Sequence, residues 1–334
     1  MKRLIIVAIL LVACLALVIP GCGEAEPPEL ITARFSGWAP PPSIPGQVEV
    51  HFFELLHEKV GDRIQVEVFQ GGTLYKYQEA QIPLSTGAVE IIDFGTIELY
   101  EWVTDFKVTT LTGAWDVDEL MTYMSSSDFE GAWDEMLEVA NCIPMMPHPA
   151  GTFFLWSTEP LSSTADFSDL RLESGNFEQI DIVKALGGSG GALQVFDIYT
   201  ALQQGQYDAA IGTPSIVLGF GWAEFVNYAY VEEAWMHNIN YFLVNKDFWD
   251  SLPSDIQQAF LEAEEETMAW ALNMFSEAEA GQLAVLESQW DIQYFTISDW
   301  ENILATAETA VWPDIRAEVG AELFDTALEY AGID

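Results

Sequence analysis

The side chains of this chain that could perform chemistry are few, and their spacing does not favour catalysis. The sequence contains four histidines, and no pair has the spacing of a metal site or a catalytic triad: His51, His57, His148 and His237. No GxSxG, Walker A or dinucleotide-binding pattern occurs. The glycine-rich run 187–191 follows a predicted helix, so it predicts a turn and not a phosphate site. We expect no enzyme, no cofactor and no metal. An extracellular hydrolase that uses two of the many carboxylates stays open as an alternative.

The N-terminal residues predict export and lipid attachment. Two basic residues precede an apolar run at 4–19 that is too short for a comfortable membrane span, which is typical of a secretory signal. The run ends in Ile-Pro-Gly-Cys, which resembles a bacterial lipoprotein box. We therefore expect a signal peptide over 1–22 that ends at a lipidated Cys22, then a linker over 23–29, in a periplasmic or cell-surface protein anchored by lipid. Cleavage at Cys14 and an uncleaved signal anchor are the alternatives.

The overall charge limits the partners. Lysine and arginine number 11 and aspartate and glutamate 53, which gives a net charge of −42. Such a field repels nucleic acid and anionic lipid, so neither is expected as a partner. Two interpretations stay open: a solvated acidic surface, or a field that favours cationic or neutral ligands. Cys142 lies in an apolar run and predicts a buried thiol.

The hydrophobic pattern predicts an α/β fold. Segments with alternating apolar residues and segments with helical spacing follow each other repeatedly, which predicts a mostly parallel sheet with crossover helices. The expected strands are 30–37, 63–69, 89–94, 145–156, 170–174, 192–196, 207–211 and 238–245. The expected helices are 47–60, 77–84, 128–140, 197–204, 253–289 and 298–328, the last interrupted at Pro313.

The length predicts two domains, because the roughly 310 residues left after signal cleavage are too many for one small core. The helix at 253–289, with Ser254 as its candidate N-cap, would extend over roughly 50 Å and brace both domains. We expect this division of the chain: lobe I at 30–150, lobe II at 151–230, a return to lobe I at 231–260, and the long helix with C-terminal helices spanning both lobes at 261–334.

Five segments, in order, resemble the extracytoplasmic solute-binding proteins of TRAP transporters: 61–69, 71–74, 85–91, 197–208 and 244–253. The resemblance covers nearly the whole mature chain. It implies a two-lobed fold like that of periplasmic binding proteins, with hinge strands and a long lobe-spanning helix. Such a protein captures a small-molecule solute as the lobes close and delivers it to the membrane permease subunits of a TRAP transporter. A lipoprotein of the same fold with a scaffolding or sensing role is the alternative.

The resemblance also indicates where a ligand would bind. Relatives usually fix a carboxylate with an arginine, and the matching position here is Glu173. Arg171 lies two residues earlier, so on a strand it points to the same face. Three alternatives stay open: Arg171 pairs with Glu173, Arg171 or Arg34 anchors a carboxylate, or Glu173 itself faces the ligand. In the last case the solute is not a simple carboxylate but an amine, a polyol or an aromatic compound.

Aromatic residues are the remaining candidate contacts. Trp38 follows the first strand, where loops of the cleft emerge. The others lie on the crossing strand or near the return strand: Phe153, Trp156, Trp222, Trp235 and His237. A cleft lined by aromatic rings and a carboxylate suits a cation or an apolar ring system. For each of these side chains, a place in the core is the alternative.

Overall fold

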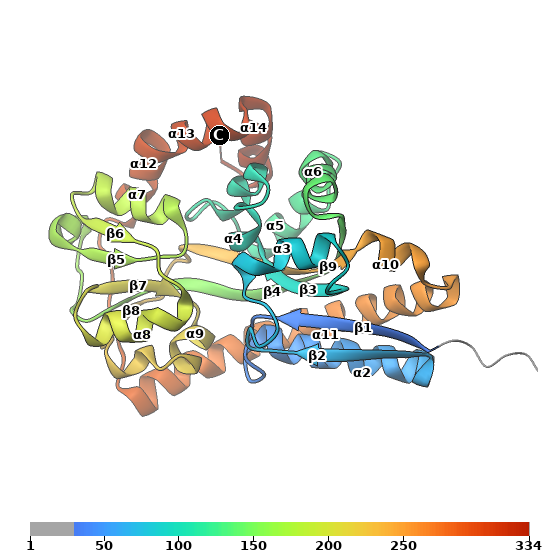
Figure 1. The fold of residues 1–334 in the computed structure, drawn as a ribbon. Coiled ribbons are helices and arrows are strands. Elements are labelled where there is room, and N and C mark those ends of the chain that lie inside the picture. Colours follow the sequence, from blue (N-terminus) through green and yellow to red (C-terminus); the bar gives the residue numbers. More distant parts are fainter. Residues whose placement is uncertain (1–29, 334) are drawn as a thin grey trace, which may run out of the picture.

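The computed structural model describes residues 30–333 (Figure 1). The predicted signal peptide, Cys22 and the linker lie outside the described residues. Among those that are described, no helix combines the length and apolar composition needed to cross a bilayer. Cys142 is buried and unpaired, as predicted, and burial raises the pKa of its thiol to about 12.

Lobe I is built on a five-stranded sheet with the order β2-β1-β3-β9-β4. Its strands are β1 (Ile31–Gly37), β2 (Ile64–Phe69), β3 (Ile91–Gly95), β4 (Cys142–Ser157) and β9 (Met236–Asn245). The first three are parallel, whereas β9 is antiparallel to β3 and to β4. Through β9 the chain rejoins this sheet after the strands of lobe II.

The strands of lobe II are arranged around the C-terminal end of β4, residues 154–157. Four short strands and one strand of two residues complete this part of the sheet: β5 (Arg171–Glu173), β6 (Ser189–Gly191), β7 (Ala209–Gly212), β8 (Tyr228–Tyr230) and β10 (Gln293–Tyr294). β7 and β8 run antiparallel to β4, and β5 pairs in parallel with both β6 and β7. The sheet is therefore mixed, and the prediction of a mostly parallel sheet holds only within each lobe's outer strands.

Helices cover both lobes. Their bounds are α2 (Ile44–Val60), α3 (Tyr77–Ser85), α4 (Thr96–Leu99), α5 (Val117–Met124), α6 (Glu130–Ala140), α7 (Phe177–Ala185), α8 (Val195–Gln203), α9 (Pro214–Gly219), α10 (Lys246–Ser251), α11 (Ser254–Trp290), α12 (Trp300–Thr306), α13 (Trp312–Val319) and α14 (Ala321–Tyr330). Short 3-10 turns join them: η1 (Gly61–Arg63), η2 (Thr104–Thr110), η3 (Thr164–Asp169) and η4 (Trp222–Glu224). On α2, the buried apolar side chains Val48, Phe52, Leu56 and Val60 have helical spacing, whereas Val50 is exposed.

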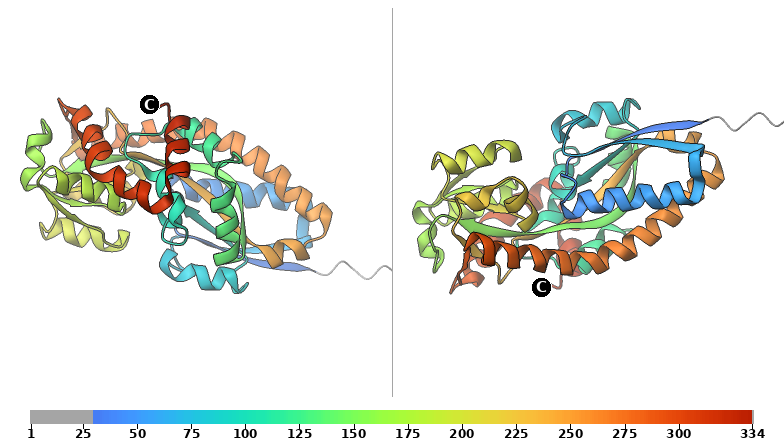
Figure 2. Two further views of the ribbon diagram at one scale, coloured as in Figure 1. Left: turned by 90° about the horizontal axis from the view of Figure 1, so that it is seen from above. Right: turned by 90° about the horizontal axis from the view of Figure 1, so that it is seen from below.

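The long helix α11 has 37 residues, or about 55 Å, and lies along both lobes (Figure 2). It packs on α2 and β4 in lobe I and on α9 in lobe II, so the predicted brace is confirmed. Its start differs by one position from the prediction. Pro253 occupies the N-cap position, and the Ser254 side chain makes no capping hydrogen bond.

The chain ends by crossing back to lobe I. α12 packs beside η3 and α7 of lobe II, and α14 packs on η2 and α5 of lobe I. Pro313 lies in the first turn of α13, directly after a π-helix at Ala307–Val311, so the predicted interruption is confirmed.

One predicted strand is wrong. Residues 192–196 do not form a strand, because β6 lies just before them and α8 begins at Val195. The strand consists of Ser-Gly-Gly, which no β-propensity predicts; pairing with β5 holds it in place. The apolar side chains that suggested a strand lie at the cleft instead.

Candidate ligand-binding cleft

A cavity of about 100 Å³ lies between the lobes. Both lobes line it: Trp38, Gly72, Lys76, Ile97, Glu98 and Asn238 from lobe I, and Phe153, Glu173, Gly175, Leu193, Gln194, Val195, Phe196, Ile198, Ile211, Ile216 and Trp222 from lobe II. Trp38, Glu98 and Glu173 come from the carboxyl ends of β1, β3 and β5. Open α/β sheets bind ligands at this edge.

Glu173 ends β5 and is only 1% exposed. The backbone N–H of Leu193 donates to its Oε1 at 3.3 Å, and its Oε2 has no hydrogen-bond partner among the described residues. Burial raises the pKa of Glu173 to about 8, and the Leu193 hydrogen bond offsets only part of that rise. The carboxyl group therefore borders the cavity without a cation to neutralise it.

Glu98 reaches the cavity from the opposite lobe. It lies on α4 directly after β3, and its Oε2 accepts a hydrogen bond of 3.0 Å from the backbone N–H of Gly95. Burial raises the pKa of Glu98 to about 8 as well, against the lowering effect of backbone N–H groups. Two carboxyl groups, one from each lobe, thus line the same space.

Aromatic rings form much of the remaining wall. The indole N–H groups of Trp38 and Trp222 are buried and have no partner among the described residues. Lys76 is the single cation that lines the cavity within the described part of the chain, and its Nζ lies 5.9 Å from the centre of the Phe196 ring. Of the predicted contacts, the cavity brings together Glu173, Trp38, Phe153 and Trp222.

Arg171 does not belong to this group. Its guanidinium pairs with Asp208 on the exposed side of lobe II and donates to the carbonyl of Gly205 at 2.7 Å. Neither the ion pair with Glu173 nor a place in the cavity is found. Arg171 begins the three-residue strand β5 and is exposed, whereas Glu173 ends it and is buried.

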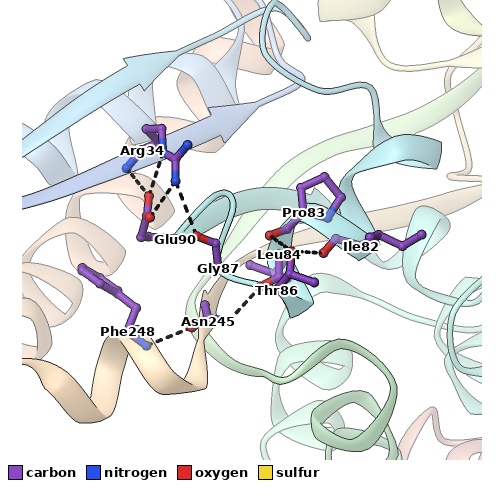
Figure 3. Close-up of polar contacts among 9 residues, drawn as sticks. All are labelled: Arg34, Ile82, Pro83, Leu84, Thr86, Gly87, Glu90, Asn245 and Phe248. Atoms are coloured by element: carbon purple, nitrogen blue, oxygen red, sulfur yellow. Dashed lines mark hydrogen bonds and ion pairs between the residues drawn. The ribbon is translucent and has the colours of Figure 1, made fainter.

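Arg34 is likewise engaged away from the cavity (Figure 3). Its Nη2 lies 2.9 Å from Glu90 Oε1, and its Nη2 also donates to the carbonyl of Gly87 at 3.4 Å. The loop that carries Glu90 is held in turn by Asn245, whose side chain donates to the carbonyl of Leu84 at 2.7 Å. The prediction that Arg34 reaches the cleft is not supported by this placement.

Three further candidates lie in the interior. Trp156 is fully buried and donates to the carbonyl of Gly212 at 2.7 Å, and Trp235 is fully buried in the hydrophobic core. His237 lies 3.3 Å from Thr152 Oγ1, and burial lowers its pKa. None of the three lines the cavity: Trp156 and Trp235 belong to the core, and His237 is half-buried beside Thr152.

A polar relay extends from the cavity into lobe I. Asn238 lines the cavity; its Oδ1 accepts from Thr96 Oγ1 at 3.0 Å, and its Nδ2 donates to Asn240 Oδ1 at 3.2 Å. Asn240 donates to Asp93 Oδ1 at 3.1 Å. The relay fixes the start of α4 and hence Glu98.

Sequence reasoning missed Glu98, Lys76, Gln194, Phe196 and Asn238. They carry no motif. The one available signal was position: Glu98 follows a strand end within a short apolar turn, where cleft residues of parallel sheets gather. Among the described residues, no three His, Cys, Asp or Glu side chains are grouped to hold a metal ion.

Comparison with known proteins identifies the family. The model of the family "bacterial extracellular solute-binding protein, family 7" matches residues 35–316. The chain belongs to this family. The TRAP resemblance drawn from the five motifs is thereby confirmed, and the fold and function are those of an extracytoplasmic solute receptor.

Family 7 relatives include the C4-dicarboxylate-binding periplasmic protein DctP of Rhodobacter capsulatus, which is 25% identical over 92% of each chain. A TRAP solute-binding protein of Shewanella oneidensis with bound succinate has a TM-score of 0.81 at 16% identity, over 91% of this chain and 100% of that one. One from Chromohalobacter salexigens with bound D-glucuronate has a TM-score of 0.81 at 19% identity, over 90% and 99%. The two structures share the two-lobed fold.

Proposed function

We propose that this family 7 receptor captures an organic cation with an apolar body, which Glu173 binds, and delivers it to the permease of a TRAP transporter. The observation that carries the proposal is the buried Glu173 carboxyl at the cavity wall, whose Oε2 has no hydrogen-bond partner among the described residues. An unpaired buried carboxylate is costly, and an ammonium group from the ligand would neutralise it.

The rest of the wall supports a cation over a carboxylate. No arginine of the described residues lines the cavity, and both candidate arginines are paired elsewhere. Trp38, Phe153, Phe196 and Trp222 line the cavity, and a ring face turned to the ligand would add a cation–π contact. The named ligands of relatives, such as succinate, D-glucuronate and C4-dicarboxylates, are acids and need a positive anchor.

The apolar lining also favours an amine over a polyol as the ligand. Isoleucine, leucine and valine side chains supply much of the wall: Ile97, Leu193, Val195, Ile198, Ile211 and Ile216. Each hydroxyl of a polyol buried there would need a hydrogen-bond partner, whereas a hydrocarbon or aryl group would not. The net charge of −42 would in addition draw cations toward the protein.

The test is a binding titration of the soluble chain from residue 23 with butylamine, phenethylamine, tetramethylammonium, succinate, glucuronate and mannitol. We expect amines to bind and Glu173→Gln to weaken that binding about 10- to 100-fold, because it removes a charge-assisted hydrogen bond. Arg171→Gln is the matched control and should change nothing. The proposal would be contradicted if succinate or glucuronate bound to the unaltered protein and the Arg171→Gln substitution abolished that binding.

We further propose that lipid on Cys22 holds the receptor at the outer face of the membrane. The support is the sequence pattern Ile-Pro-Gly-Cys with its polar linker. In cells that carry the full chain, Cys22→Ala should release the protein from the membrane fraction, and mass spectrometry should find acyl chains on Cys22 of the unaltered protein. Acylation at Cys14 would contradict this assignment.

A further inference from the structure

We infer that the ligand is a diamine whose two ammonium groups bind Glu98 of lobe I and Glu173 of lobe II. The inference rests on the proposed function and extends it, because an amine receptor needs only one carboxyl. It accounts for a second carboxyl at the same cavity.

The two carboxyl groups share the features of an unfilled anchor. Both line one cavity, and neither forms an ion pair with a described side chain. Glu173 Oε2 is buried without a partner. Glu98 uses one oxygen to accept from Gly95 N–H. Each therefore keeps acceptor capacity that an ammonium group would use.

The position of Glu98 is fixed before any ligand arrives. It belongs to a one-turn helix whose first residue, Thr96, donates to Asn238, and Asn238 is held by Asn240 on the same strand. A carboxyl anchored in this way loses little side-chain freedom on binding. This favours a role in recognition.

The space between the carboxyls suits a hydrocarbon chain. Apolar side chains such as Ile97, Leu193 and Ile211 line it, so methylene groups would replace water there. Lys76 also lines the cavity, but its ammonium lies over the Phe196 ring and the side chain is exposed, so solvent screens its repulsion.

A diamine would also connect the lobes. One end would bind α4 of lobe I and the other β5 of lobe II, so the energy of the second contact is available only when the lobes close. Closure would then depend on ligand length.

The test compares diamines with monoamines of equal length by isothermal titration at pH 7, from diaminopropane to diaminohexane and from propylamine to hexylamine. We expect one diamine length to bind at least about tenfold more tightly than its monoamine. Glu98→Gln should weaken binding of that diamine about tenfold, and it should weaken binding of the monoamine much less. Glu173→Gln should weaken both.

Glu101→Gln is the matched control, since Glu101 is exposed at the end of the same segment and does not line the cavity. Thermal unfolding of each variant checks that it is folded. The inference is overturned if no diamine exceeds its monoamine, or if Glu98→Gln leaves diamine binding unchanged or weakens monoamines equally. If Glu173→Gln leaves every amine unaffected, the proposed function itself is wrong.

Discussion

At the scale of single residues, folding removes the Glu49 carboxyl from water. Glu49 lies on α2 and is fully buried beside Asp93 of β3. Gln70 donates to its Oε2 at 2.7 Å, while its Oε1 has no partner among the described residues. His148 Nε2 lies 3.6 Å from the far oxygen of Asp93. Burial is the main cause that raises the pKa of Glu49 well above its usual range, and the charge of Asp93 is the second cause.

This arrangement makes stability depend on pH. The folded protein keeps a proton on Glu49 that the unfolded chain releases near pH 4.3, so the free energy of unfolding falls as pH rises through the folded-state pKa. Glu49→Gln mimics the protonated acid and still accepts from Gln70. We expect the variant to lose less stability than the unaltered protein between pH 5 and 9, by up to about 1.4 kcal/mol per pH unit.

Urea unfolding at several pH values measures the effect. Glu98, Glu173 and Glu178 also have raised pKa values, but they are present in both proteins, so the difference isolates Glu49. Parallel pH curves for the two proteins would show that Glu49 is ionised in the fold.

At the scale of elements, the two crossing strands are irregular where they pass between the lobes. The pairing of β4 with β9 shifts twice, between Met145 and His148 and between Pro149 and Gly151. The freed N–H of Met146 donates to Glu264 at 2.6 Å and that of Thr152 donates to Glu279 at 2.8 Å, both on α11. The long helix therefore completes the hydrogen bonding of the hinge.

Glycine is required at one position of this crossing. Gly151 has φ +151°, and a Cβ there would lie 2.4 Å from Thr213 Cγ2. Gly281, within α11, has open space around the same position. We expect Gly151→Ala to destabilise the protein by about 1–3 kcal/mol and Gly281→Ala to stabilise it by about 0.5–1 kcal/mol.

Thermal and denaturant unfolding of the two glycine variants provides the comparison, because the chemical change is identical in both. Equal effects of the two substitutions would mean that the crossing adapts to a methyl group. That result would contradict the close approach of Gly151 to Thr213.

The sequence predicted elements better than it predicted contacts. Alternation at Ile64, Val66 and Val68 predicted β2, although only Ile64 of the three is buried. Apolar spacing predicted α2 and α11, because burial of one side of a helix requires such a local pattern. The positions of the Arg171 and Glu98 side chains depend on partners far along the chain: Asp208 for Arg171, and Asn238 with its hydrogen-bonded neighbours for Glu98. Periodicity carries no information about such partners, so the cleft was predicted only in part.

At the scale of the whole molecule, charge is the dominant feature. Its 53 acids repel one another, and salt screens that repulsion over about 10 Å at 0.1 M. We expect the unfolding midpoint to rise as sodium chloride increases from low to about 0.5 M, and the association rate of an amine ligand to fall. Glucose at equal osmolality serves as the control. A midpoint that falls with salt would contradict this account.

The lobes are joined by several segments rather than by one linker. β4 and β9 run through both, α11 packs on both, and the C-terminal helices return from lobe II to lobe I. Closure must therefore bend strands and a helix together, which favours a small hinge motion over a free swing.

The position of β9 has a consequence for the protein's synthesis. β9 lies between β3 and β4, so the sheet of lobe I has a gap until residues 236–245 have been made, and β8, which pairs with β4 on one side, lacks β10 on the other until Gln293 and Tyr294 follow. A chain that ends before residue 236 therefore lacks an inner strand of the lobe I sheet, and we expect it not to fold stably.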